Sequence, residues 1–166
     1  NALHQADKHK EFLQGLINSW RRLWGQGKMY FFWCQLANFR DVKEMPVNRN
    51  SWVEVSEQLR LALEGTEDTG LVVLHDVGEV KDIHPKNKID VGKRFSLHAL
   101  NKAYGIDLVA SGPLYEKHEI NQDKFIISFT EVGDGLMSAT KVLLNDPVET
   151  DGSLTGFQIC DQNNQW

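Results

Sequence analysis

Two short apolar runs, set between longer helical patterns, limit most strongly what this chain can fold into. They span Met29 to Leu36 and Gly70 to His75. Runs of this length, rich in aromatic or branched side chains, are typical of strands buried on both faces of a parallel sheet. Helical periodicity covers residues 5–24, 51–65 and about 85–105, so the order is helix, strand, helix, strand, helix. That alternation predicts an α/β fold with right-handed crossovers on a parallel sheet.

The helical stretches carry apolar residues at three- and four-residue spacing. In the first helix this stripe consists of Phe12, Leu13, Leu16, Ile17, Trp20, Leu23 and Trp24. We expect Trp20, Trp24 and Trp52 to lie in the core. Ser51 begins a capping-box pattern, and Pro85 fits the first position of the third helix. Two strands with three helices cannot cover a sheet on both faces, so residues 1–105 are predicted to be the C-terminal portion of a doubly wound domain.

Residues 106–166 follow a different pattern. Strand-like runs at 107–110, 124–129, 139–144 and 156–160 are separated by stretches rich in Gly, Asp and Asn. This spacing predicts antiparallel strands of a β-sandwich, of which the chain contains only the opening strands. The predicted boundary between the two regions falls after residue 105.

The composition excludes some classes of function. The 166 residues fit one domain, or one domain with a piece of another. The net charge of −5 argues against nucleic acid as a partner. No apolar run approaches the ~20 residues that span a bilayer, so no membrane partner is predicted. The chain starts at Asn1 in a helical pattern and ends in a β pattern, from which we expect a fragment, a processed chain or an isolated domain.

The two cysteines, Cys34 and Cys160, are far apart in the sequence. Two separate reduced thiols in the core are the preferred interpretation, and a disulfide stays open because spacing does not decide it. The sequence contains no CxxC and no zinc-binding pattern, and it predicts no cofactor.

The loop between the second predicted strand and the third helix contains the sequence Asp82-Ile-His-Pro-Lys-Asn-Lys88. Loops at the carboxyl ends of parallel strands are where α/β proteins place their sites. His84 lies within reach of Asp82, and a histidine beside a carboxylate can act as a general base whose tautomer and orientation the acid fixes. His84 and Asp82 are therefore the predicted catalytic pair.

This block resembles the catalytic-histidine block of the SGNH hydrolases, in particular of the sialate O-acetylesterase-like carbohydrate esterases. Three further stretches carry the same resemblance, at residues 12–24, 32–39 and 111–115. Together they cover roughly residues 1–115 in one consistent order. The resemblance implies that residues 1–105 are the C-terminal part of a flavodoxin-like, SGNH-type hydrolase domain, and that a β-sandwich accompanies it.

The resemblance also implies a serine hydrolase that removes O-acetyl groups from sialic acid or related sugars. His84 matches the histidine that takes the serine proton and later protonates the leaving hydroxyl. The family's orienting aspartate lies three residues before the histidine, where this chain has Lys81. Asp82, Asp76 and a backbone carbonyl, which would leave a Ser–His dyad, all remain open for that role. Asp82 is equally suited to cap the following helix.

The Gly-Gln-Ser-type block that carries the family's serine has no counterpart in this chain. The family's oxyanion block is followed by residues that resemble Asn1-Ala2, so the chain is expected to start just after it. We therefore expect the parent protein to be the esterase, its missing N-terminal part to be a partner, and this chain alone to be inactive. The resemblance further implies a periplasmic, secreted or lysosomal location.

Gln35 and Asn38 end the aromatic strand on the side of the His84 loop. They are candidates for contacting the acetylated sugar, although polar residues at strand ends more often support the structure.

Two other classes of function remain. One is a carbohydrate-binding or assembly module without catalysis, which aromatic side chains on exposed strand faces would favour. Tyr115, Phe125 and Phe129 are the candidates, but Phe125 and Phe129 share one face and are expected to lie in the core. The other is a metal-dependent hydrolase that uses His75, Asp76, Asp82 and His84, which are suitable ligand types without a known metal-binding spacing.

Overall fold

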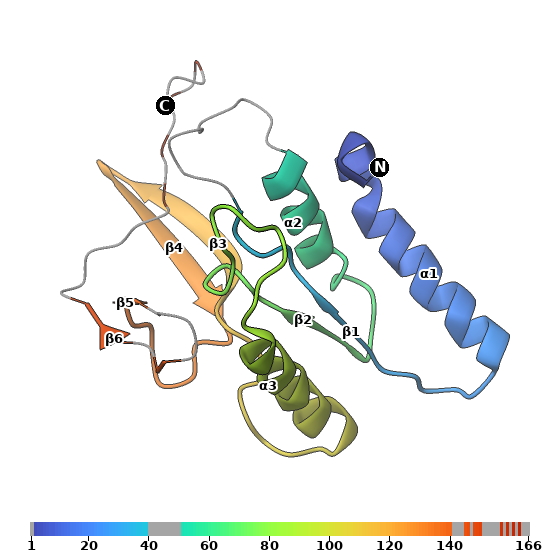
Figure 1. Cartoon of the computed structure of the whole chain (residues 1–166). Helices are drawn as coiled ribbons and strands as arrows, with labels where there is room; N and C mark the ends of the chain where they lie inside the picture. The colour runs from blue at the N-terminus through green and yellow to red at the C-terminus, as the bar shows by residue number, and fades with distance from the viewer. Residues whose placement is uncertain are drawn as a thin grey trace.

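The computed structural model describes residues 2–39, 51–140, 145–146, 148–150, 157, 159, 161 and 163. After a 3-10 segment at Ala2–Lys8, the front half contains α1 (His9–Trp24), β1 (Phe31–Cys34), α2 (Ser51–Leu61), β2 (Thr69–Val72) and α3 (Lys88–His98) (Figure 1). β1 and β2 pair in parallel, from Phe31 opposite Thr69 to Cys34 opposite Val72. The predicted order of helices and strands is therefore confirmed.

Alternate residues of β1 contact helices on opposite faces of the sheet. Phe31 lies edge-on to a tryptophan of α1, and the indole N–H of Trp33 donates to a carbonyl of α2 at 3.0 Å. On the other face, Phe32 stacks on His98 of α3, with 5.6 Å between ring centroids, and Cys34 packs near Val91 and Phe95 of the same helix. This two-residue period explains why the strand is apolar without interruption.

The interior beside β2 leaves no space for a side chain at Gly70. A Cβ at that position would lie 2.5 Å from Nδ1 of His98. The His98 ring is held there because its Nε2–H donates to the Leu71 carbonyl at 2.9 Å. Glycine at this position thus allows α3 to approach the strand closely.

α1 differs from the prediction because much of its apolar face is exposed. Ile17 is the fully buried residue of its apolar stripe. Five other large apolar side chains of α1 are 45–80% exposed: Phe12, Leu16, Trp20, Leu23 and Trp24. The placement of Trp20 and Trp24 in the core is therefore wrong, whereas Trp52 is half-buried. Periodicity identifies the apolar face of a helix, but it does not tell whether anything packs on that face.

α3 begins three residues later than predicted. Asn87, not Pro85 or Asp82, caps it: the Asn87 side-chain oxygen accepts from the Asp90 N–H at 3.1 Å. An asparagine in that position satisfies one of the free N–H groups of the first turn, so it fixes the start of the helix. Pro85 stays in the preceding loop.

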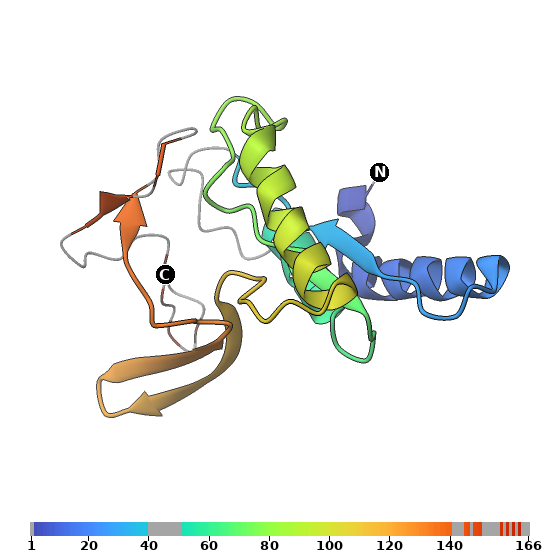
Figure 2. The ribbon, with the colours of Figure 1, turned by 90° about the horizontal axis from the view of Figure 1, so that it is seen from below.

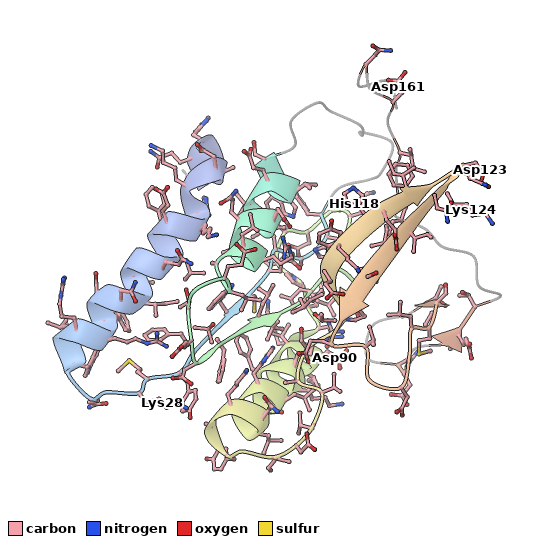
Figure 3. All side chains as sticks on the ribbon, turned by 180° about the vertical axis from the view of Figure 1, so that it is seen from behind. Lys28, Asp90, His118, Asp123, Lys124 and Asp161 are labelled. Carbon is pink, nitrogen blue, oxygen red and sulfur yellow. The ribbon has the colours of Figure 1, made fainter. Side chains whose placement is uncertain are left out.

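Past residue 105 the described strands are short antiparallel pairs. β3 (Leu114–Asn121) and β4 (Lys124–Thr130) form a hairpin, and β5 (Ala139–Thr140) pairs with β6 (Val148–Glu149). Figure 2 shows the hairpin projecting away from α1 and β1. Figure 3 marks His118 along the hairpin and Asp123 and Lys124 at its tip.

The strand predictions for this region are only partly met. β4 confirms the run at 124–129, but residues 107–110 form no strand, and β3 was not predicted because its side chains are mostly polar and exposed. The run at 139–144 is seen as β5, and residues 141–144 and most of 156–160 lie outside the described residues. The β-sandwich and the boundary at residue 105 therefore stay predictions.

Two findings concern the cysteines and the prediction that no segment spans a membrane. Cys34 is a free, half-buried thiol, and burial raises its pKa; Cys160 lies outside the described residues. None of the helices in the described part of the chain is both long and apolar enough to cross a membrane.

Candidate active site

The loop between β2 and α3, residues 73–87, carries the predicted catalytic pair. It leaves the carboxyl end of β2 and is drawn in green in Figure 1. Leu74 and Val77 of this loop are buried in a cluster with Ala37 and Val72. The side chain of His84, in contrast, is 86% exposed. The loop is thus anchored in the core near its start and presents the histidine to solvent.

Asp82 lies directly beside His84. Its Oδ1 accepts the backbone N–H of His84 at 2.9 Å and is 3.5 Å from the ring Nδ1. The backbone hydrogen bond fixes where the carboxylate stands relative to the ring. A carboxylate at this position favours the tautomer with its proton on Nδ1, and Nε2 is then free to accept a proton. The structure therefore brings together the two residues predicted as a pair.

The same hydrogen bond keeps Asp82 ionised. Donation by the His84 backbone N–H holds the pKa of the Asp82 carboxyl below its ordinary value. Asp82 is consequently an anion at neutral pH, and it can stabilise the positive charge that an imidazole gains when it accepts a proton. Because both side chains are exposed, solvent screens part of this interaction.

Asp76, the alternative aspartate, is engaged elsewhere. Both of its oxygens accept from the guanidinium of Arg94 in α3, at 2.7 and 2.5 Å. Arg94 also donates to the Val73 carbonyl at 2.6 Å, so it ties the start of the loop to α3. Asp76 thus supports the loop, and Asp82 is the aspartate placed at His84.

Two residues that sequence reasoning did not single out brace the loop on either side of His84. Glu79 accepts from the backbone N–H of Lys86 at 3.3 Å and pairs with its ammonium group at 3.1 Å. These contacts join two points of the loop seven residues apart. No sequence signal marks such a pair, because loop residues have no periodicity.

Asn38 supports the same loop from the end of β1. Its Oδ1 accepts the N–H of Gly78 at 2.7 Å. The approach is so close that a Cβ on Gly78 would lie 1.9 Å from the Asn38 carbonyl oxygen. Gln35 is buried, and its side-chain amide donates to the Ser56 carbonyl at 3.2 Å. Asn38 therefore contacts the loop, and Gln35 lies in the interior against α2.

The four proposed metal ligands do not gather. The described residues, which include His75, Asp76, Asp82 and His84, contain no group of three or more His, Cys, Asp or Glu side chains that could hold a metal ion. The geometry therefore gives no support to the metal-dependent hydrolase.

Comparison with known proteins adds a fact that the geometry alone does not give. No family model matches the chain, and no curated protein matches it significantly. Among solved structures, the chain is similar to a carbohydrate acetylesterase from Xanthomonas citri, with a TM-score of 0.69 and 32% sequence identity over 81% of this chain. This likeness supports a carbohydrate esterase. The chain spans 32% of the length of that acetylesterase.

Proposed function

We propose that this chain supplies the histidine and its orienting carboxylate to a carbohydrate esterase that removes O-acetyl groups from sialic acid or a related sugar. The observation that carries the proposal is the contact of Asp82 with His84 in a loop at the carboxyl end of β2. The similarity to a carbohydrate acetylesterase supports the ester and the sugar as substrate classes. The likeness of residues 82–88 to the sialate esterase block supports the finer choice of sugar.

In the proposed reaction, a serine from another part of the parent protein attacks the acetyl carbonyl. Nε2 of His84 accepts the serine proton as the carbon–oxygen bond forms, and Asp82 stabilises the resulting imidazolium. His84 then donates that proton to the departing sugar hydroxyl, which leaves an acetyl-serine. Water, deprotonated by the same nitrogen, releases acetate and restores the serine.

The experiment that tests this function measures acetate release from O-acetylated sialic acid and from acetylated xylan. The parent protein and the isolated chain of 166 residues are compared. We expect turnover by the parent, none by the isolated chain, and a loss of at least about a hundredfold in His84→Ala of the parent. Lys81→Ala, an exposed change in the same loop, is the matched control and should keep full activity.

Three results would contradict parts of this proposal. Full activity of the His84→Ala parent would remove His84 from the mechanism. Turnover by the isolated chain that His84→Ala abolishes would show that the chain has its own nucleophile. Release of acetate from xylan but not from sialic acid would retain the esterase and reject the sialate substrate.

A second candidate function, sugar binding by the β3–β4 hairpin, is favoured by one observation. The Tyr115 hydroxyl shares a 2.7 Å hydrogen bond with Nδ1 of His118, and the His118 ring lies 6.3 Å from Phe125. This row of rings is exposed, although Arg60 of α2 lies 5.7 Å from the Tyr115 ring centre. Aromatic faces of this kind can stack on sugar rings. Calorimetric titration of the chain with acetylated sugars, comparing Phe125→Ala with Ile126→Ala on the opposite face of β4, would test it; the 49% exposure of Phe125 also shows that its expected place in the core is wrong.

A further inference from the structure

The imidazole of His84 has few contacts that hold it in place. Its side chain is 86% exposed, and within the described residues the ring pairs only with Asp82, whose Oδ1 is 3.5 Å from Nδ1. An exposed side chain samples several rotamers, and a catalytic group that is misplaced by about 1 Å can lose on the order of a hundredfold in rate. The position of the ring therefore depends on the backbone of the loop that carries it.

Glu79 joins that loop to the end of the sheet. Its main chain forms a parallel bridge with Phe39, and the N–H of the preceding Gly78 donates to Asn38 at 2.7 Å. The Glu79 side chain is 28% exposed, compared with 72% for the side chain of its partner Lys86. Glu79 is thus the anchored member of the ion pair, and Lys86 is the member that the loop carries.

The carboxylate of Glu79 holds Lys86 at two points. Its Oε1 accepts the backbone N–H of Lys86 at 3.3 Å, and its Oε2 pairs with the ammonium group at 3.1 Å. The first contact involves the main chain, so the pair closes residues 79–86 into a ring that contains Asp82 and His84. The Lys86 carbonyl in turn accepts the N–H of Lys88, the first residue of α3, at 2.8 Å. The closed ring therefore ends directly at the helix.

The charges of this ring attract one another in sequence. The hydrogen bond to Glu79 is the main cause that raises the pKa of the Lys86 ammonium, and the charge of Asp82 adds to that shift. On Asp82, the backbone N–H of His84 is the main cause that lowers the pKa, and the charge of Lys86 adds to it. Single ion pairs at exposed positions contribute little, but several charges that form a network can favour one arrangement.

We propose that Glu79 and Lys86 act as one unit that positions the Asp82–His84 pair for the proposed ester hydrolysis. Neither residue needs to touch the substrate. Glu79 relates the loop to the edge of the sheet, and closure of the ring at Lys86 sets the direction in which the imidazole is presented. Such support limits the conformations that a catalytic base samples. The inference rests on the proposed function, because it gives the two residues a part in that reaction.

Hydrogen exchange of the His84 backbone N–H tests the positioning without any substrate. This N–H donates to the aspartate of the pair, so its protection reports on that contact. In an NMR measurement on the chain, Glu79→Gln and Lys86→Met should each speed exchange by about threefold or more, and the double variant should exchange no faster than the faster single variant. Lys86→Arg keeps the cation and should exchange within about twofold of the unchanged chain. Glu64→Gln, which removes an exposed ion pair with α1, is the matched control and should have no effect.

The rate of acetyl ester hydrolysis by the parent protein tests the consequence. Glu79→Gln and Lys86→Met should each lower kcat about threefold to tenfold and leave KM within about twofold, because a positioning residue acts on the base and not on the bound substrate. The double variant should lose no more than the weaker single variant, since residues that act as a unit are not additive. Lys86→Arg should keep at least about half of kcat.

Four results would overturn the inference. Unchanged exchange of the His84 N–H in both single variants would separate Glu79 and Lys86 from the pair, and additive losses in the double variant would separate them from each other. A higher KM with unchanged kcat would make them substrate contacts. Equal losses in Lys86→Arg and Lys86→Met would show that the charge is not what acts. If the parent protein hydrolyses no acetyl ester, the proposed function fails, whereas faster His84 exchange in both single variants would still show that the unit holds the pair.

Discussion

At the scale of single residues, the site depends on one short contact between neighbours in a loop. Asp82 is two residues from His84, and its carboxylate is held by the backbone N–H of the histidine that it faces. The carboxylate is therefore fixed by the same residue that it orients. That arrangement needs no distant element, which is why it was visible as a candidate in the sequence.

Replacing Asp82 by asparagine tests the orienting role that we propose for it in ester hydrolysis. The amide keeps the size of the side chain but removes its charge, so the imidazolium formed during the reaction loses its stabilising anion. We expect kcat/KM to fall about tenfold to a hundredfold, less than for loss of a fully buried partner because solvent screens an exposed pair. Asp123→Asn, at the tip of the β3–β4 hairpin, is the matched control. Unchanged kcat/KM in Asp82→Asn would favour a Ser–His dyad.

The lowered pKa of His98 predicts that the stability of the fold depends on pH. Burial is the main cause that lowers its pKa, and the hydrogen bond to the Leu71 carbonyl opposes that shift. The unfolded state, with a histidine pKa of about 6.5, therefore binds a proton before the folded state does. The free energy of unfolding should fall as the pH drops below about 6.5 and should be unaffected by this group above it. Urea unfolding at pH 7.5 and 5.5 measures this, and His98→Gln should show a smaller difference between the two.

At the scale of elements, close approach of α3 to the sheet determines where the His84 loop ends. α3 lies on β2 because Gly70 leaves space for the His98 ring. At its other end, Asn87 caps α3, and Arg94 ties it back to the loop through Asp76. The helix is therefore tied to β2 by His98 at its C-terminal end and to the start of the loop by Arg94.

Two glycine substitutions separate this packing from helix propensity. Gly70→Ala places a methyl group 2.5 Å from the His98 ring, and we expect it to reduce the free energy of unfolding by about 1–3 kcal/mol, as overpacking does. Gly92→Ala lies within α3 with nothing within 4 Å of the added carbon, and it should raise the free energy by about 0.5–1 kcal/mol. Chemical denaturation of the isolated chain compares them. Equal effects would show that the His98 ring moves aside at no cost.

At the scale of the whole molecule, the described residues expose many large apolar side chains. Five of them lie on α1: Phe12, Leu16, Trp20, Leu23 and Trp24. We expect the isolated chain to bind a hydrophobic fluorescent dye such as ANS while keeping its far-UV circular dichroism. Leu16→Gln with Leu23→Gln should reduce the dye fluorescence about twofold or more, since both side chains belong to the exposed apolar face of α1. Asn18→Gln is the control, and an equal reduction in that variant would assign the dye to another surface.

Sequence patterns predicted the order of helices and strands in the front half and the proximity of Asp82 to His84, but not the details that depend on distant contacts. β1 was recognisable because both of its faces contact helices, so its apolar run is unbroken. β3 was not, because its polar side chains have no period that indicates a buried face. The start of α3 was misplaced because Pro85 and Asn87 both suit a helix start, and in the structure the Asn87 side chain accepts the Asp90 N–H. Glu79 carried no sequence signal, and the motif that contains Lys86 did not indicate its contact with Glu79.

The anchors of the His84 loop have a consequence for the length of this segment in related sequences. Before the histidine, the N–H of Gly78 donates to the Asn38 side chain. After the histidine, Asn87 caps α3. The number of residues between these two points sets how far the imidazole stands from the edge of the sheet. One inserted or deleted residue would move it by up to about 3.3–3.6 Å, more than the reach of a hydrogen bond. We therefore expect related sequences to vary in the residue types between these anchors far more than in their number.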